Sequence, residues 1–389
     1  MPKQNSLLLN ILNRDNPARK VLAIRSADRG LADRPHFPLL AMVGQTEMKT
    51  ALILTLINPH VGGILLIGPR GTGKTTAVRG LIDLLPPVQR STCPNGCEPE
   101  AAYAHGFDAI CSDCAQKIGR GEPITAPDRM RLVELPLNAR LEDVIGGVSE
   151  RVALEQNRVH LERGILAQAD QNVLYIDEVN LLDDQVANSI LDAAAQDQYS
   201  VRRGPLAATY RSRLILIGSM NPEEGRLRPQ IHDRFGLRVV VRGLPNEGER
   251  LEIYRRVQTY RTNPYALADA WSEEMSAAAN EIVEARGRLP KVALTREVER
   301  LGLGWIKRLG IDSHRTEITL FEAARAHAAA DGRTKVNLRD LRAVAPLALR
   351  QRRSPFMTDY FTAQSGEDKQ ISRVVRGAPK AGAAKAGRA

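Results

Sequence analysis

Two patterns of hydrophobic and polar residues divide the chain. Up to residue 244, short apolar runs rich in Ile, Leu and Val alternate with longer segments of mixed polarity. Such runs are typical of parallel strands that are buried on both faces of a sheet. They lie at residues 63–67, 131–135, 172–176, 214–219 and 237–241. From residue 245 no further run of this kind appears, and apolar residues recur at helical spacing instead. These helical segments cover residues 247–260, 267–286, 294–310, 316–331 and 337–349.

The segments between the strand candidates predict helices and one hairpin. A helix should begin near residue 75 and continue until Pro86 and Pro87 stop it. A second helix is expected over residues 183–195, with apolar side chains on one face. Residues 198–210 predict a hairpin with its turn at Gly204-Pro205. The fold class is therefore α/β, with a parallel sheet and a C-terminal all-helical domain.

The strongest motif lies at the junction of the first strand and the first helix. Its glycines let the backbone curl so that successive N–H groups face inward, which suits a polyphosphate. Lys74 is placed to reach the β- and γ-phosphates, and Thr75 offers a hydroxyl to Mg²⁺. A turn at Val43-Gly44 is of the kind that packs near the adenine in many phosphate-loop motors. The predicted loop residues are Gly68, Pro69, Arg70, Gly71, Thr72, Gly73, Lys74, Thr75 and Thr76.

Two later strand candidates are followed by polar residues that fit the same nucleotide site. Asp177 and Glu178 follow the run at 172–176. Asp177 can hold Mg²⁺ through its waters, and Glu178 can orient and deprotonate the attacking water. Asn221 follows the run at 214–219, and its amide is suited to hydrogen-bond the γ-phosphate or that water. Alone, the acidic pair would be a solvated turn, but the phosphate loop favours the catalytic interpretation.

All four cysteines lie in an insertion between the first two strand candidates. Cys93 and Cys97 are separated by Pro94-Asn95-Gly96. Cys111 and Cys114 are separated by two residues, a spacing common in zinc knuckles. Two such pairs favour one tetrahedral Zn²⁺, because the turn would bring the first pair together. Four thiolates would close the coordination sphere, so the expected zinc is structural. Redox-active or free thiols are the alternatives, and His105 is a weaker substitute ligand.

Composition and charge exclude several classes of protein. The chain has 389 residues, of which 43% are hydrophobic and 26% charged, as in ordinary globular proteins. The formal net charge is +10, but residues 1–37 and 365–389 together supply +8 of it. The nearly neutral remainder argues against a nucleic-acid-binding protein. No segment predicts a membrane span or a signal-peptide core, so we expect a cytoplasmic protein.

With these motifs in this order, the chain resembles an AAA+ ATPase. Residues 164–167, 174–184 and 221–236 are similar, more narrowly, to ATPase subunit I of magnesium chelatase. That family couples hydrolysis of MgATP to insertion of Mg²⁺ into protoporphyrin IX, the first committed step toward chlorophylls. The resemblance spans residues 38–350 and implies an arginine finger at Arg234 and a second sensor at Arg315.

The same resemblance implies partners and a division into domains. A homo-oligomeric ring, expected to be a hexamer, would act with a second AAA+ subunit that carries an adhesion domain and with a large porphyrin-binding subunit. The predicted parts are an extension (1–37), an ATPase core (38–244) with the cysteine insertion (91–127), a helical lid (245–353) and a basic, disordered tail (354–389).

Other interpretations remain at this stage. A cobaltochelatase-like or MoxR-type ATPase that remodels a protein would have the same motor residues. A nucleic-acid-dependent ATPase would require stimulation by DNA and sensitivity to salt. A zinc scaffold without catalysis is disfavoured by Lys74, Asp177 and Glu178.

Overall fold

The computed structural model describes most of the chain between residues 34 and 352. The described residues are 34–93, 96–147, 161–204, 206–225 and 227–352, together with Gln370. The predicted extension (1–37) and basic tail (354–389) therefore lie almost entirely outside them. The predicted turns at Pro94-Asn95-Gly96 and Gly204-Pro205 lie partly outside. No helix among the described residues is long and apolar enough to cross a membrane.

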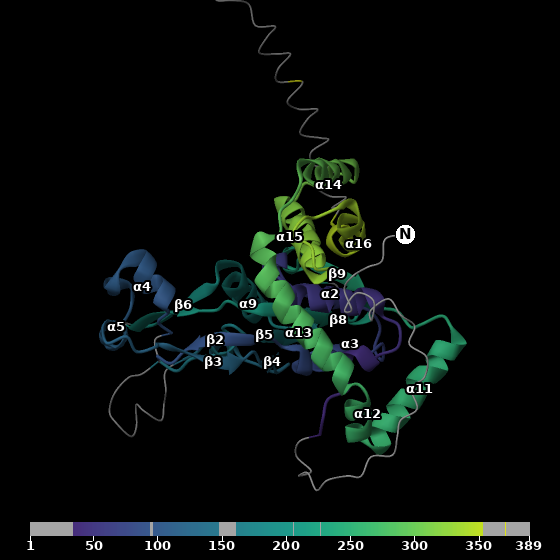
Figure 1. The fold of residues 1–389 in the computed structure, drawn as a ribbon, viewed down its shortest axis with the longest axis horizontal. Coiled ribbons are helices and arrows are strands. Elements are labelled where there is room, and N and C mark those ends of the chain that lie inside the picture. Colours follow the sequence, from purple (N-terminus) through teal and green to yellow (C-terminus); the bar gives the residue numbers. More distant parts are fainter. Residues whose placement is uncertain are drawn as a thin grey trace, which may run out of the picture.

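A five-stranded parallel sheet forms the centre of the molecule (Figure 1). Its order is β4-β5-β8-β1-β9. The strands are β1 (Ile64–Ile67), β4 (Leu132–Leu135), β5 (Val173–Ile176), β8 (Ile215–Met220) and β9 (Leu237–Val240). Ile64 is paired with Ile217 of β8 and with Leu237 of β9, which places β1 between them. All five apolar runs are thus confirmed as strands of one sheet.

Both faces of the sheet are covered, which explains why its strands are continuously apolar. Because side chains alternate along a strand, Ile64 and Leu66 of β1 pack into one core and Leu65 and Ile67 into another. The first core includes α2 and helices of the C-terminal region, and the second includes α6, α8 and α9. The helices of the α/β region are α2 (Thr46–Ile57), α3 (Lys74–Arg79), α6 (Leu141–Ile145), α8 (Ile165–Gln168), α9 (Asp184–Gln196) and α10 (Pro229–Arg234).

The helix after the phosphate loop is shorter than the sequence predicted. α3 ends at Arg79, and a 3₁₀ turn at Ile82–Leu84 follows, so the helix does not continue to Pro86. At Gly80 an added Cβ would lie 2.6 Å from the carbonyl oxygen of Phe37. The N-terminal segment therefore packs directly against this glycine, a tertiary contact that local periodicity does not reveal.

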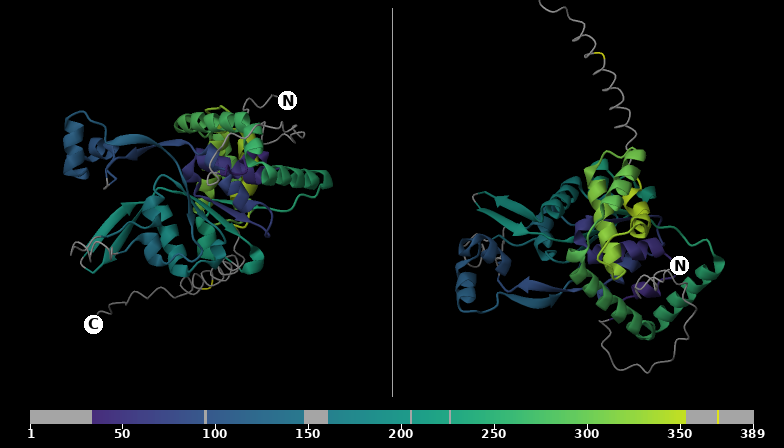
Figure 2. Two further views of the ribbon diagram at one scale, coloured as in Figure 1. Left: turned by 90° about the horizontal axis from the view of Figure 1, so that it is seen from below. Right: turned by 45° about the horizontal axis from the view of Figure 1, so that its top comes forward.

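The cysteine insertion projects away from the sheet on a two-stranded arm (Figures 1 and 2). The arm consists of β2 (Pro87–Ser91) and β3 (Thr125–Arg129), which pair antiparallel. Helices α4 (Pro99–His105) and α5 (Ser112–Gly119) lie at its end. A separate hairpin joins β6 (Gln198–Arg203) to β7 (Leu206–Arg211), as the sequence predicted.

The C-terminal region is helical, as predicted, and packs against the sheet through α2 and directly against β9. The contacts of α2 with α13 and α15 join the two regions. One predicted helix, 267–286, is divided at Trp271, a buried residue that faces the Arg256 guanidinium. The helices are α11 (Glu247–Thr262), α12 (Pro264–Ala270), α13 (Ser272–Arg288), α14 (Arg296–Arg308), α15 (His314–Ala330) and α16 (Leu338–Leu349).

Candidate functional site

The predicted phosphate loop lines a polar cavity at the carboxyl ends of the strands. Gly71 and Gly73 have φ values of +77° and +84°, a region that favours glycine. At Gly68 an added Cβ would lie 2.1 Å from the carbonyl oxygen of Val241, so only glycine fits. The cavity has a volume of about 240 Å³. It is lined by Arg70, Gly71, Thr72, Gly73, Lys74, Thr75, Thr76, Asp177, Glu178, Ser219, Met220 and Asn221.

Lys74 folds back onto the loop that precedes it. Its Nζ donates to the carbonyl oxygens of Gly68 at 2.7 Å and Pro69 at 2.9 Å. Partial burial lowers the pKa of Lys74, while Asp177, Glu224 and Glu178 act in the opposite direction. The ammonium group therefore has carbonyl partners that phosphate oxygens can replace.

Asp177 is held by hydroxyl groups from three different strands or helices. Thr75 Oγ1 donates to Asp177 Oδ2 at 3.1 Å, Tyr175 OH donates to Oδ1 at 2.9 Å, and Ser219 Oγ also donates to Oδ1. Burial acts to raise the pKa of Asp177, but these hydrogen bonds outweigh it and hold the pKa below its ordinary value. Ser219 and Tyr175 were not predicted as site residues from the sequence, although both occupy strands next to predicted site residues.

Glu178 has an unusual backbone conformation. Its φ and ψ are 50° and 51°, in the left-handed region, which costs a non-glycine residue about 1–3 kcal/mol. Its N–H donates to Ser219 Oγ at 3.2 Å, so Ser219 contacts both acidic residues. Its carboxylate lies 3.5 Å from the Arg70 guanidinium. The turn therefore directs Glu178 toward the phosphate loop.

Asn221 is positioned by the short turn that follows β8. Its Nδ2 donates to Glu224 Oε1 at 2.9 Å, and its Oδ1 accepts from the Glu223 N–H at 3.3 Å. Glu224 also forms an ion pair with Arg70 of the phosphate loop. The hydrogen bond from Asn221 and the charge of Arg70 lower the pKa of Glu224. Glu224 is a further site residue that the sequence analysis missed.

The segment that contains Val43 and Gly44 lies beside the phosphate loop but does not line the cavity. Met42 Cε would be 2.9 Å from a Cβ added at Gly73. Gly44 has a φ of +59°, and a Cβ there would lie 2.9 Å from Leu244 Cδ2. This segment is therefore packed between the loop and the start of the helical region, next to the phosphates' expected position.

Arg234 and Arg315 lie elsewhere, in a second cavity of about 930 Å³. Gly63, Asn172 and Gly236 also line it, and they precede the strands β1, β5 and β9. Because parallel strands all run the same way, this cavity is at the edge opposite the phosphate loop. Arg234 donates to the carbonyl oxygen of Leu191 at 3.3 Å and pairs with Asp192 at 2.8 Å, both in α9.

The four cysteines come together at the end of the projecting arm. Their sulfur atoms all lie within 4.8 Å of one another, and none forms a disulfide. Cys93 Sγ is 3.8 Å from Cys97 Sγ and 3.6 Å from Cys111 Sγ. The Cys114 backbone N–H is the main cause that lowers the pKa of Cys111 to about 6. A thiol set of this kind can hold one metal ion.

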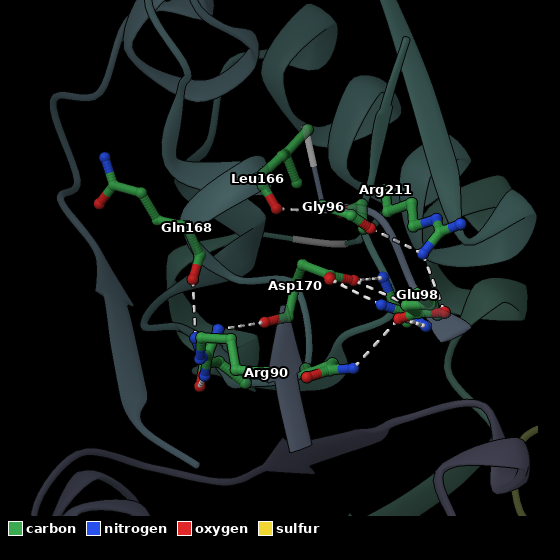
Figure 3. A network of polar contacts seen from close by, with 11 residues as sticks. Arg90, Gly96, Glu98, Leu166, Gln168, Asp170 and Arg211 are labelled. Carbon is green, nitrogen blue, oxygen red and sulfur yellow. Dashed lines mark hydrogen bonds and ion pairs between the residues drawn. The ribbon is translucent and has the colours of Figure 1, made fainter. Parts of the chain in front are cut away.

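Polar contacts attach the base of this cysteine cluster to the ATPase region (Figure 3). Glu98 forms ion pairs with Arg211 at 2.8 Å and Arg213 at 2.5 Å. Arg211 also donates to the carbonyl oxygen of Gly96 at 3.0 Å. Arg213 in turn pairs with Asp170 at 2.8 Å, before strand β5. The residues on either side of Cys97 are therefore fixed to the core.

The parallel sheet, phosphate loop, acidic strand end and helical lid define an AAA+ ATPase. Residues 59–221 match the model of the AAA domain, and residues 307–373 match that of the AAA lid domain. The chain belongs to the family of magnesium-chelatase subunit I, an AAA+ subunit of that chelatase.

Two curated relatives support this assignment over most of the chain. A magnesium-chelatase subunit ChlI homolog of Methanocaldococcus jannaschii is 43% identical over 82% of this chain and 87% of its own. The magnesium-chelatase 38 kDa subunit of Acidiphilium rubrum is 39% identical over 81% of this chain and 90% of its own. A solved complex between subunits BchI and BchD of magnesium chelatase contains a chain that is 37% identical, with a TM-score of 0.45, covering 82% of this chain and 96% of that one.

Proposed function

We propose that this chain is the ATP-hydrolysing motor subunit of a magnesium chelatase, which inserts Mg²⁺ into protoporphyrin IX. The observation that carries the proposal is the convergence of Lys74, Asp177, Glu178 and Asn221 on one cavity, in a chain of this family. The division into an ATPase core (38–244), a cysteine insertion (91–127) and a lid (245–353) is part of the same proposal.

Within this proposal, each residue of the phosphate cavity has a distinct role. Lys74 exchanges its two carbonyl partners for the β- and γ-phosphates of ATP. Glu178 orients the attacking water and accepts its proton, and Asn221 aligns that water with the γ-phosphate. Arg70 lies between Glu178 and Glu224, where it can contact the phosphate once ATP enters.

The residues present also fit the Mg²⁺ that accompanies ATP. Thr75 and Asp177 offer a hydroxyl and a carboxylate that lie 3.1 Å apart, which are oxygen donors of the kind Mg²⁺ prefers. Bound Mg²⁺ would neutralise negative charge on the phosphates. Ser219 and Tyr175 keep Asp177 ionised and oriented for this role.

Arg234 and Arg315 act in this proposal on the nucleotide of a neighbouring chain. They line the cavity at the edge opposite their own phosphate loop, so they are directed away from the ATP that the same chain binds. A ring of identical chains would place this edge against the phosphate cavity of the next subunit. We therefore propose a homo-oligomeric ring, a hexamer by its resemblance to the family, with an adhesion-domain AAA+ subunit and a large porphyrin-binding subunit as partners.

For the cysteine cluster we propose one structural Zn²⁺. With Zn–S bonds of about 2.3 Å, a tetrahedral site has sulfur atoms about 3.8 Å apart. The 3.6 and 3.8 Å separations around Cys93 agree with this requirement. All four positions are thiols, so the ion would be closed to substrate. Anaerobically purified protein should hold about one zinc per chain, and Cys97→Ser should lose most of it; absence of zinc from wild-type protein would refute the site.

The proposed activity is tested by adding purified chain to the two partner subunits, MgATP and protoporphyrin IX. Fluorescence of magnesium porphyrin should appear only when this chain and ATP are both present. Glu178→Gln should abolish product while leaving the subunits able to assemble. ATP hydrolysis without product, from partners proven competent with another subunit I, would instead favour a MoxR-type remodelling ATPase.

A further inference from the structure

The last described residues of the helical region are joined to the helix that carries Arg234. Residues 350–352 follow α16 and run beside α10. Arg352 Nη1 pairs with Asp233 Oδ1 at 3.0 Å, and its Nη2 donates to the carbonyl oxygens of Phe235 at 3.2 Å and Gly236 at 2.6 Å. Its Nε donates to Ala348 within α16 at 3.2 Å. One guanidinium thus joins the lid to both sides of Arg234.

A second arginine makes the same connection from the sheet. Arg238, in β9, donates through Nη2 to the carbonyl oxygen of His232 in α10 at 2.8 Å. Its Nη1 donates to the carbonyl oxygen of Gln351 at 2.5 Å. His232 Nε2 and Gln351 Oε1 also lie 2.9 Å apart. Strand β9, helix α10 and the end of the lid are therefore linked at one point.

These two arginines are buried, unlike most arginines on a protein surface. Each side chain is only 1% exposed, and both pair with the single carboxylate of Asp233. Burial and the charge of Arg352 lower the pKa of Arg238 to about 9, against the opposing effect of Asp233. A buried charge is costly unless its hydrogen-bonding groups find partners, so these contacts strongly restrict the relative position of the three segments.

Helix α10 depends on such external contacts because it is short. It covers only Pro229–Arg234, and Arg234 is its last residue. The described contacts of the Arg234 side chain itself are with α9, one of them to the half-exposed Asp192. A helix of this length has little stability alone, so its neighbours determine where Arg234 points.

We propose that Arg352 and Arg238 are positioning residues that fix α10 against the end of the lid and thereby set how Arg234 reaches the neighbouring subunit. The inference rests on the proposed function, in which Arg234 acts on the nucleotide of the next chain.

The test compares Arg352→Ala and Arg352→Lys with Arg350→Ala as the matched control. The Arg350 side chain lies in the same segment but pairs with Glu47 of α2, at 3.0 Å. Loss of positioning should lower kcat by about tenfold to a hundredfold in Arg352→Ala, because small misplacements of a catalytic group have effects of that size. KM for ATP should stay within about twofold, since the chain's own phosphate loop is intact. Arg352→Lys should retain intermediate activity, and Arg350→Ala should match wild type.

Mixed rings separate positioning from general damage to the fold. Arg352→Ala chains mixed with Lys74→Ala chains should recover activity, because an intact Arg234 then meets an intact phosphate loop at shared interfaces. An unchanged kcat in Arg352→Ala would overturn the inference. So would failure of this mixture when Arg234→Ala with Lys74→Ala recovers activity in verified mixed rings. Failure of both mixtures would overturn the action of Arg234 on a neighbour and, with it, the positioning role.

Discussion

The two edges of the sheet differ in how completely one chain builds a site there. At the carboxyl edge, the phosphate loop, Asp177, Glu178 and Asn221 surround a cavity of about 240 Å³. Thr75 of the loop donates directly to Asp177, and Asn221 is joined to Arg70 of the loop through Glu224. At the amino edge, Arg234 and Arg315 line a cavity of about 930 Å³ that also receives residues from the arm and the lid. The first edge carries the phosphate loop, whereas the second is lined by Arg234 and Arg315, the residues proposed to act on a neighbouring chain. In the proposed ring, the two edges of neighbouring chains would together form one catalytic centre.

The largest effect is expected when a mutation removes the arginine finger at the amino edge. Arg234→Ala should lower kcat by about 10³ to 10⁵, the range that arginine fingers contribute. Mixing it with Lys74→Ala should restore part of the activity, because each chain supplies the half that the other lacks. The measurement is steady-state ATPase activity of mixed rings whose composition is verified by native mass spectrometry. A complete lack of recovery would show that Arg234 does not act between chains.

A smaller loss is expected at the carboxyl edge from Glu178→Gln. Removal of a general base lowers kcat by about 10² to 10⁴, while ATP should still bind because Lys74 and Thr75 remain. Glu223→Gln is the matched control, since Glu223 is exposed and its recorded contact with Asn221 is through the backbone N–H. ATP affinity and single-turnover hydrolysis would be measured for both variants. Normal turnover in Glu178→Gln would remove Glu178 from the catalytic role.

Ser219→Ala tests whether Ser219 holds Asp177 and Glu178 in position before ATP binds. Ser219 contacts Asp177 and the Glu178 N–H, so its loss should loosen both groups and lower kcat/KM by about tenfold. Raising the Mg²⁺ concentration should recover part of this loss if Asp177 is the main group affected. An unchanged kcat/KM would indicate that Ser219 has no part in positioning either group.

The smallest effect concerns stability at low pH. The folded protein holds the pKa of Asp177 below its ordinary value, so the unfolded chain takes up a proton first as pH falls. The stabilisation is thus present above about pH 4, the ordinary Asp value, and is lost as pH falls through the lower folded pKa. Asp177→Asn should show a weaker decline of Tm between about pH 5 and 3 than wild type. Identical slopes would contradict this assignment, whereas Arg234→Ala should leave the slope unchanged.

Much of the fold was predictable because it depends on local patterns. The five strand runs and the hairpin at β6 and β7 were confirmed, since period and turn residues are properties of neighbouring positions. The end of α3 and the break at Trp271 were not predicted. Gly80 is packed against the N-terminal segment, and Trp271 is buried beside Arg256, and both contacts join residues far apart in sequence.

The candidate site shows the same division. The phosphate loop and Asp177-Glu178 are contiguous segments, so their chemistry could be predicted from the sequence alone. Ser219 lies outside the motifs, and Glu224 had no predicted role within the segment 221–236. Their contacts arise only when β5, β8 and the phosphate loop are brought side by side. The available signals were the position of Ser219 near the end of β8 and that of Glu224 in the turn that follows Asn221.

By itself the sequence determined an α/β ATPase with a helical lid, a phosphate loop and four cysteines spaced for a metal, because each is encoded in local order and spacing. Tertiary structure alone decided that Arg234 and Arg315 face the edge opposite the chain's own phosphate loop. It also decided that Arg352 and Arg238 meet at Asp233. There are two physical reasons. All strands of a parallel sheet run the same way, so their amino and carboxyl ends lie at opposite edges. Buried charges find partners only when segments distant in sequence pack together.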